Sequence, residues 1–261
     1  MKRLPAARKR TDEPQPGIPP AIGLYSTPKG IRTVDSPVRV KILSVLSTRD
    51  LPFDEIVRLS GRAKSTVSVH LRGLEDDGII GSRVDPDDER KKIFFLRSQN
   101  LGTLAGGIAL PDEKGPAGSF PAGTDPFAFY RYMFRTIRVS LLTEGINIDP
   151  VLRESGYRVG TVLAKEFAGR DLSVLLQDLG AFWRNHNLGS LRVESVAPLT
   201  LRAYDCFECG DLPQLGRPAC AFDSGILEAV FSGHFGKKHK VEETACYAMG
   251  DDHCRFLITP Q

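Results

Sequence analysis

Apolar residues recur at helical spacing in three short segments between residues 35 and 78. The first segment opens with Ser36 and Pro37, which are typical of an N-cap and of the first helical position. Its apolar positions follow at helical intervals: Val38, Ile42, Val45 and Leu46. A second helix is expected from near residue 52 and a third over about 64–77. Gly61 and Gly78 follow these two segments, and glycine commonly ends a helix.

The pattern then changes to one that favours strands. Residues 79–84 and 91–97 are rich in β-prone residues and flank a polar turn, so a β-hairpin is expected. Three helices and a hairpin within one short region are the arrangement of a winged helix-turn-helix. In the third helix Val67, Leu71 and Leu74 fall on one face, which predicts that this face packs into the core.

The opposite face of the third helix carries the candidate DNA contacts, because small hydroxyl and basic side chains can reach phosphates and base edges. These residues are Ser65, Thr66, Ser68, Val69 and Arg72. The hairpin adds basic residues for backbone or minor-groove contact: Arg83, Arg90, Lys91 and Lys92. The alternatives are a charged hairpin that is merely solvated and a winged helix that binds protein.

Four segments are expected along the chain, with an α+β fold. Residues 1–34 are rich in Pro, Gly and basic residues and predict a flexible basic arm. Residues 35–97 form the winged helix-turn-helix, and the Gly- and Pro-rich residues 98–125 form a linker. Residues 126–261 form a mixed α/β domain. It has helices to about 186, strands at 191–196 and 199–204, a short helix near 224–232, and strands near 238–249 and 253–258.

Charge and composition narrow the classes of function. Residues 1–97 carry 19 Lys or Arg against 13 Asp or Glu, whereas residues 98–261 carry 16 against 19. A basic N-terminal half fits a polyanionic partner. No apolar run approaches the roughly 20 residues that cross a bilayer. No apolar segment follows the basic start MKRLPAARKR. We therefore expect a cytoplasmic protein without a membrane partner.

All five cysteines lie at or beyond Cys206, and in a reducing compartment this favours metal or redox chemistry over disulfides. Cys220, Cys246 and Cys254 cluster with a carboxylate, Glu243, three residues before Cys246. Three thiolates and one carboxylate suit four-coordinate Zn²⁺, as a structural or a sensor site. Cys206 and Cys209 form a C-x₂-C pair, which could be half of a metal site, a redox dithiol that resolves an oxidised neighbour, or two packed thiols.

Residues 36–96 resemble the ArsR-type winged helix of prokaryotic and archaeal repressors. The segment STVSVHLRGLEDDGII carries most of the resemblance. The resemblance implies that the chain binds double-stranded operator DNA as a homodimer. The region contains no cysteine pair, so a metal sensor built into the DNA-binding domain is not supported.

The C-terminal half resembles the 4-vinyl reductase domain. The motifs are G-x₃-C-x-F-x₂-G at 216–225, V-x-E-x₂-C at 241–246 and G-x₃-C-x-F at 250–256. Related sensor domains of phenol-responsive activators hold zinc through three Cys and one Glu. Those positions fall on Cys220, Glu243, Cys246 and Cys254 here.

The two domains together resemble the MsvR family of redox-responsive transcription regulators from methanogens. That resemblance implies a redox role for the C-terminal cysteines: Cys206, Cys209, Cys220, Cys246 and Cys254.

Three functions follow from these patterns. The first is a redox-responsive transcription regulator with a zinc-containing sensor domain. The second is a regulator that senses a small organic effector and uses zinc only as a structural ion. The third is an enzyme of the vinyl-reductase type. The sequence argues against an enzyme, because it has no G-x-G-x-x-G nucleotide fingerprint after a strand and because four protein ligands leave a metal no open position.

Overall fold

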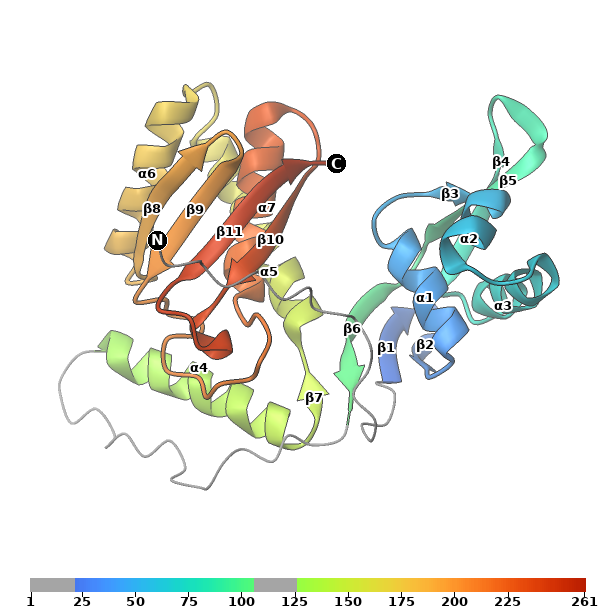
Figure 1. The fold of residues 1–261 in the computed structure, drawn as a ribbon, viewed down its shortest axis with the longest axis horizontal. Coiled ribbons are helices and arrows are strands. Elements are labelled where there is room, and N and C mark those ends of the chain that lie inside the picture. The colour runs from blue at the N-terminus through green and yellow to red at the C-terminus, as the bar shows by residue number, and fades with distance from the viewer. Residues whose placement is uncertain (1–21, 106–125) are drawn as a thin grey trace, which may run out of the picture.

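The computed structural model describes residues 22–105 and 126–261 (Figure 1). The first range contains β1 (Ile22–Thr27), β2 (Gly30–Val34), α1 (Pro37–Leu46), β3 (Leu51–Pro52), α2 (Phe53–Ser60), α3 (Lys64–Asp76), β4 (Ile80–Asp85), β5 (Asp88–Leu96) and β6 (Gln99–Leu104). The second range contains α4 (Pro126–Thr143), β7 (Ile146–Asn147), α5 (Asp149–Glu166), α6 (Leu172–Asn185), β8 (Ser190–Val196), β9 (Leu199–Tyr204), α7 (Ala221–Phe235), β10 (His239–Ala245), the 3₁₀ turn η1 (Tyr247–Met249) and β11 (Cys254–Pro260).

The N-terminal part has the predicted winged helix-turn-helix architecture. The Ser36 hydroxyl accepts a hydrogen bond from the Arg39 backbone N–H and caps α1. Gly61 ends α2 in the left-handed conformation that glycine adopts without strain. The three predicted apolar positions of α3 are buried, and β4 pairs with β5 to form the wing. The prediction of fold class is confirmed for this half.

Two predicted boundaries differ from the structure. The prediction of a flexible arm is wrong for residues 22–34, which form the hairpin β1–β2. The prediction of a linker is wrong for residues 99–104, because β6 pairs with β1. The physical reason is tertiary: Tyr25 and Val34 enter the core of the winged helix, and short strands among Gly and basic residues carry a weak local signal. The rest of the predicted arm and linker, residues 1–21 and 106–125, lies outside the described residues.

One sheet connects the two halves of the chain. Its strand order is β2-β1-β6-β7, and β7 lies beyond residue 125, between α4 and α5 (Figure 1). Gly102 of β6 has φ +152° and lies so close to the Asn147 backbone that a Cβ atom would overlap the Asn147 carbonyl oxygen. Glycine at this position therefore permits the close approach of β6 to β7.

The C-terminal half is a mixed α/β domain, as predicted. Its antiparallel sheet has the order β10-β11-β9-β8. The long helix α7 connects β9 to β10 and packs against α5. A Cβ atom at Gly156 of α5 would overlap the Phe222 carbonyl oxygen, and one at Gly225 of α7 would overlap the Arg153 carbonyl oxygen. These glycines hold the two helix backbones in contact. The core of this domain includes Trp183, which is fully buried.

Among the described residues, the helices are too short or too polar to traverse a lipid bilayer.

Candidate metal centre and nucleic-acid interface

Four elements of the C-terminal domain bring the five cysteines to one place. Cys206 and Cys209 follow the end of β9, and Cys220 is the N-cap residue of α7. Cys246 follows β10, and Cys254 begins β11. All five side chains are buried thiols in the reduced state. The sheet and the N-terminus of α7 therefore build a closed cluster of sulfur atoms from residues that are distant in the sequence.

The predicted zinc ligands lie together. One ligand atom from each of Cys220, Glu243, Cys246 and Cys254 falls within 4.8 Å of the others. The Cys220 sulfur is 3.9 Å from that of Cys246 and 3.5 Å from that of Cys254. Zinc–sulfur bonds of about 2.3 Å place the sulfurs of a tetrahedral site about 3.8 Å apart. The sulfur positions therefore fit a zinc-sized ion.

The carboxylate of Glu243 has one oxygen that is held and one that is open to a ligand bond. Oε2 accepts a hydrogen bond of 2.8 Å from the Cys220 backbone N–H. Oε1 is buried and has no hydrogen-bond partner within the described part of the chain. A buried oxygen without a partner is costly, and coordination to a cation would remove that cost. The donor set fits Zn²⁺ by position and by chemistry.

Burial and neighbouring thiols shift the acidities of this cluster. Burial raises the pKa of Glu243 to about 9. Hydrogen bonds from the thiols of Cys209, Cys220 and Cys254 lower the pKa of Cys246. A thiolate is therefore favoured at Cys246.

Cys206 and Cys209 lie in the same cluster, which the sequence left open. The Cys206 sulfur is 3.5 Å from the Cys220 sulfur, and the Cys209 sulfur is 3.1 Å from the Cys254 sulfur. A second group of four, Cys206, Cys209, Cys220 and Cys254, also has its sulfurs within 4.8 Å of one another.

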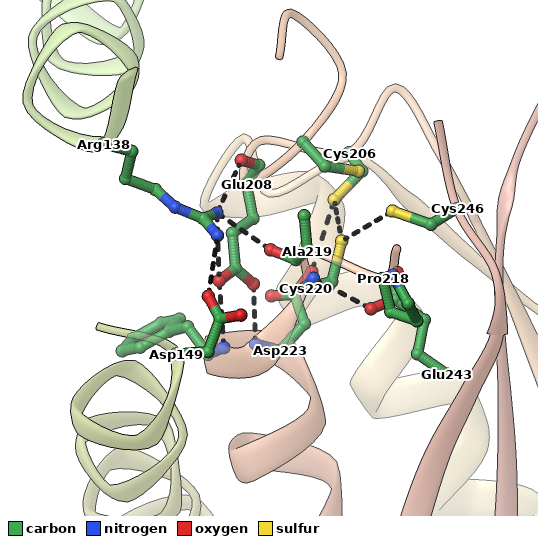
Figure 2. A network of polar contacts seen from close by, with 12 residues as sticks. Arg138, Asp149, Cys206, Glu208, Pro218, Ala219, Cys220, Asp223, Glu243 and Cys246 are labelled. Atoms are coloured by element: carbon green, nitrogen blue, oxygen red, sulfur yellow. Dashed lines mark hydrogen bonds and ion pairs between the residues drawn. The ribbon is translucent and has the colours of Figure 1, made fainter. Parts of the chain in front are cut away.

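Sequence reasoning missed a buried arginine that holds two of the cysteine-bearing loops. Arg138 of α4 donates hydrogen bonds to the carbonyl oxygens of Glu208 and Ala219, which directly precede Cys209 and Cys220 (Figure 2). It also pairs with Asp149 at the start of α5, at 3.2 Å. The sequence does not single out Arg138, because the same apolar helix also carries Arg131 and Arg135.

Glu208 caps α7 and is not available as a free ligand. Its two carboxylate oxygens accept hydrogen bonds from the backbone N–H groups of Phe222 and Asp223, at 3.0 and 3.1 Å (Figure 2). The free N–H groups at a helix start favour such a carboxylate. Burial raises the pKa of Glu208 to about 8, and the nearby Arg138 opposes that shift.

A cavity of about 770 Å³ lies between the winged helix and the metal cluster. Ser44, Ser47 and Thr48, at the end of α1 and just beyond it, line one side. Cys220 and Glu243 are among the residues that line the other side. A smaller apolar cavity of about 190 Å³ lies between Phe134, Phe207 and Phe222, among other residues. The cysteine cluster therefore faces the winged helix across the larger cavity.

The predicted DNA-binding residues lie on the surface of α3 and the wing. Ser65, Ser68, Val69 and Arg72 are exposed, and Thr66 is half-buried. Val69 is 70% exposed.

The basic residues of the wing are exposed as well. Arg83 pairs with Asp50 at 2.8 Å and lies over the Phe95 ring. Lys91 and Arg90 both pair with Asp88, and Lys92 is exposed. The helix face and the wing both lie at the surface, and their contacts with DNA remain a prediction.

Two models of known protein families each match one segment of the chain. Residues 36–82 match the model of the bacterial regulatory protein, arsR family. Residues 199–260 match the model of the 4-vinyl reductase domain. The predicted combination of an ArsR-type helix-turn-helix with a 4-vinyl reductase domain is confirmed.

Relatives in Methanocaldococcus jannaschii align with about half of this chain. The protein described as uncharacterized protein MJ1642 is 32% identical over 126 residues, which are 48% of this chain and 74% of the relative. The uncharacterized protein MJ0150 is 27% identical over 128 residues, 48% of this chain and 73% of the relative.

Two solved structures are similar at 17% identity. A vinyl-4-reductase family protein from M. jannaschii aligns with a TM-score of 0.38 over 54% of this chain and 85% of its own. The phenol-responsive sensory domain of the transcription activator PoxR, with phenol, aligns with a TM-score of 0.41 over 86% of this chain and 91% of its own.

Proposed function

The chain belongs to the same family as MJ1642, and we propose that it is a redox-responsive transcription regulator whose 4-vinyl reductase domain holds Zn²⁺ through Cys220, Glu243, Cys246 and Cys254. The family models support its assignment as an ArsR-type DNA-binding regulator with a sensor domain of the 4-vinyl reductase type. ArsR-family domains typically bind DNA as dimers, and we propose a homodimer on operator DNA here. In this proposal the chain acts as a regulator and not as an enzyme.

One observation carries the redox proposal: every thiol of the chain is gathered in one buried cluster, remote in sequence from the helix that reads DNA. Bound zinc would keep the ligating thiols as thiolates, which are also the oxidisable form. Loss of a ligand on oxidation would weaken the site and change the packing of the loops that it joins.

The geometry favours a particular pair for oxidation. The Cys209 and Cys254 sulfurs are 3.1 Å apart, and a disulfide requires about 2.05 Å. One thiolate attacks a peroxide, the O–O bond breaks, and a sulfenic acid forms with release of water or an alcohol. The second thiol then displaces water and forms the S–S bond. Because Cys254 belongs to the proposed zinc set, this disulfide removes a ligand.

The signal has a physical route to the DNA-binding part of the chain. β6 pairs with β7, which directly precedes α5, and Asp149 of α5 pairs with Arg138. Glu243 and the end of α1 also line the same cavity of about 770 Å³. A change in the cluster can therefore alter how the two winged helices of a dimer are held. A tenfold change in affinity requires only about 1.4 kcal/mol of coupling.

A gel shift with full-length protein and the DNA upstream of its own gene tests the proposal. We expect tighter binding in reductant than after diamide or peroxide, with zinc released as affinity falls. Reductant should restore binding once zinc is returned. Equal affinity in the oxidised and reduced protein would reject the redox function while leaving the DNA-binding assignment in place.

A second candidate function is the sensing of a small organic effector. The observation that favours it is the apolar cavity of about 190 Å³, whose lining includes Phe134, Phe207 and Phe222. Apolar walls with a few polar groups are typical of sites for small ligands. An effector there would contact the loop between Cys206 and Cys209. The same gel shift, repeated with small aromatic compounds under constant reductant, separates this function from redox sensing.

A further inference from the structure

Six of the possible donor residues around Cys220 form two overlapping groups of four, and Glu208 and Asp223 form a third group with Cys220 alone. We name Cys220, Glu243, Cys246 and Cys254 the glutamate set, and Cys206, Cys209, Cys220 and Cys254 the sulfur set. In each set the ligand atoms lie within 4.8 Å of one another. Cys220 and Cys254 belong to both sets. Among the described residues, no such group contains both Cys206 and Cys246.

The sulfur set has the spacing of a tetrahedral thiolate site. Three of its six sulfur–sulfur distances are 3.5 Å for Cys206–Cys220, 3.5 Å for Cys220–Cys254 and 3.1 Å for Cys209–Cys254. A tetrahedral zinc site with four thiolates has edges of about 3.8 Å. The three distances are shorter than this value by a few tenths of an ångström to about 0.7 Å. Mutual repulsion of thiolates bound to one ion would lengthen them.

The shared and the exchangeable donors come from different parts of the fold. Cys220 caps the buried helix α7, and Cys254 begins β11 in the middle of the sheet. Both are held by regular structure. Cys206 and Cys209 belong to the loop after β9. Glu243 lies near the C-terminal end of the edge strand β10, and Cys246 directly follows that strand. Figure 2 shows Cys206 and Cys246 each linked to the Cys220 sulfur.

We propose that one metal ion can be held by either set. Cys220 and Cys254 stay bound, and the pair Cys206 and Cys209 replaces the pair Glu243 and Cys246. This inference rests on the proposed metal centre and adds a second, all-sulfur site to it. The exchange is a substitution of ligands, so no electron is transferred. Soft cations such as Cd²⁺ favour the sulfur set, because its four donors are all thiolates.

The exchange has a consequence for the cavity beside α1. Glu243 lines that cavity together with Lys240 and Arg153. When the sulfur set holds the ion, Glu243 is no longer one of its ligands. The occupied set would thereby determine whether Glu243 is a metal ligand or a free side chain beside this cavity.

Zinc content and X-ray absorption of the full-length protein test the inference. Zinc–oxygen bonds are about 2.0–2.2 Å and zinc–sulfur bonds about 2.3 Å, so the shell of ligands can be counted by type. We expect Glu243→Gln and Cys246→Ser each to retain about one zinc per chain, with a shell of sulfur only. Glu242→Gln, on the same strand and outside both sets, is the matched control and should keep the wild-type shell.

A double variant tests both sets in one protein. Cys209→Ser/Cys246→Ser leaves each set one donor short, and we expect zinc affinity about a hundredfold below that of either single variant. Zinc present in the wild type but lost from both Glu243→Gln and Cys246→Ser would overturn the sulfur set and leave the glutamate set intact. A wild-type protein without zinc would overturn the metal centre altogether. Retention of wild-type affinity by the double variant would overturn both sets as drawn.

Discussion

Arg138 donates a hydrogen bond of 2.8 Å to the carbonyl oxygen of Ala219, the residue that directly precedes Cys220. The same nitrogen also lies 3.2 Å from the carbonyl oxygen of Glu208, which precedes Cys209. One buried guanidinium thus fixes the two loops that bring Cys209 and Cys220 together. Its position depends in turn on Asp149, at the junction of β7 and α5.

Replacement of Arg138 by Met is expected to destabilise the C-terminal domain by about 3–5 kcal/mol, because it removes the donor to the carbonyl oxygens of Glu208 and Ala219 and the cation beside the buried Glu208 carboxylate. Urea unfolding can be followed by fluorescence of Trp183, which is the single tryptophan of the chain and is fully buried in this domain. Arg158→Met removes an exposed pair with Glu154 on α5 and serves as control, with a change within about 0.5 kcal/mol. Equal effects of the two substitutions would contradict the role of Arg138.

Loss of a shared cysteine is expected to empty the metal centre. Cys220→Ser and Cys254→Ser each remove a donor from both sets, so we expect zinc content to fall well below about one ion per chain. The midpoint of Trp183 unfolding should fall with it, since metal binding contributes to folding free energy. Glu242→Gln is the control for both measurements. Full zinc content in both cysteine variants would show that the ligands lie elsewhere.

The local sequence was sufficient for the parts of the fold whose side chains repeat with a clear period. In α3 the buried positions Val67, Leu71 and Leu74 could be predicted because a helix surface repeats every 3.6 residues. Strands β8 and β9 could be predicted from their alternation. The hairpin β1–β2 could not, because its order comes from burial of Tyr25 and Val34 against helices distant in sequence.

The residues of the cysteine cluster also divide into those that the sequence predicted and those that it did not. Spacing and family resemblance indicated Cys220, Glu243, Cys246 and Cys254, and the structure brings them together. The proximity of Cys209 to Cys254 depends on the register of β9 against β11, which pairs Cys254 with Ala203. A single sequence carries no signal for that register. The hydrogen bonds of Arg138 likewise depend on where α4 packs.

Arg72 and Lys92 are expected to contribute to DNA binding in different ways. If Arg72, exposed on α3, contacts a base edge, Arg72→Ala should weaken binding to the operator by about 1–3 kcal/mol and leave non-specific binding almost unchanged. Lys92→Ala should weaken binding to every sequence and lower the slope of log K against log salt by about 0.9. Titrations of operator and random DNA at several salt concentrations provide both values. The DNA-binding face would be misassigned if neither variant differed from Arg158→Ala.

The contact between Gly102 and Asn147 allows a test of communication between the two halves of the chain. A methyl group at Gly102 would overlap the Asn147 carbonyl oxygen, so Gly102→Ala should separate β6 from β7. Gly30→Ala is the matched control, because Gly30 also has positive φ but has no atoms near its added methyl group. Both substitutions lower the free energy of unfolding by about 1–2 kcal/mol, because alanine disfavours positive φ. A difference in DNA binding between the two variants therefore reports on the contact between β6 and β7.

We expect Gly102→Ala to reduce the ratio of operator affinities between reduced and oxidised protein from about tenfold towards one. Zinc content and the Trp183 unfolding midpoint should stay close to those of Gly30→Ala, because the metal cluster lies in the other sheet. Operator affinity in reductant provides the check that the winged helix is still folded. If Gly102→Ala keeps the full redox ratio, the signal does not pass through the β6–β7 pair. The cavity between Glu243 and the end of α1 would then be the remaining connection to examine.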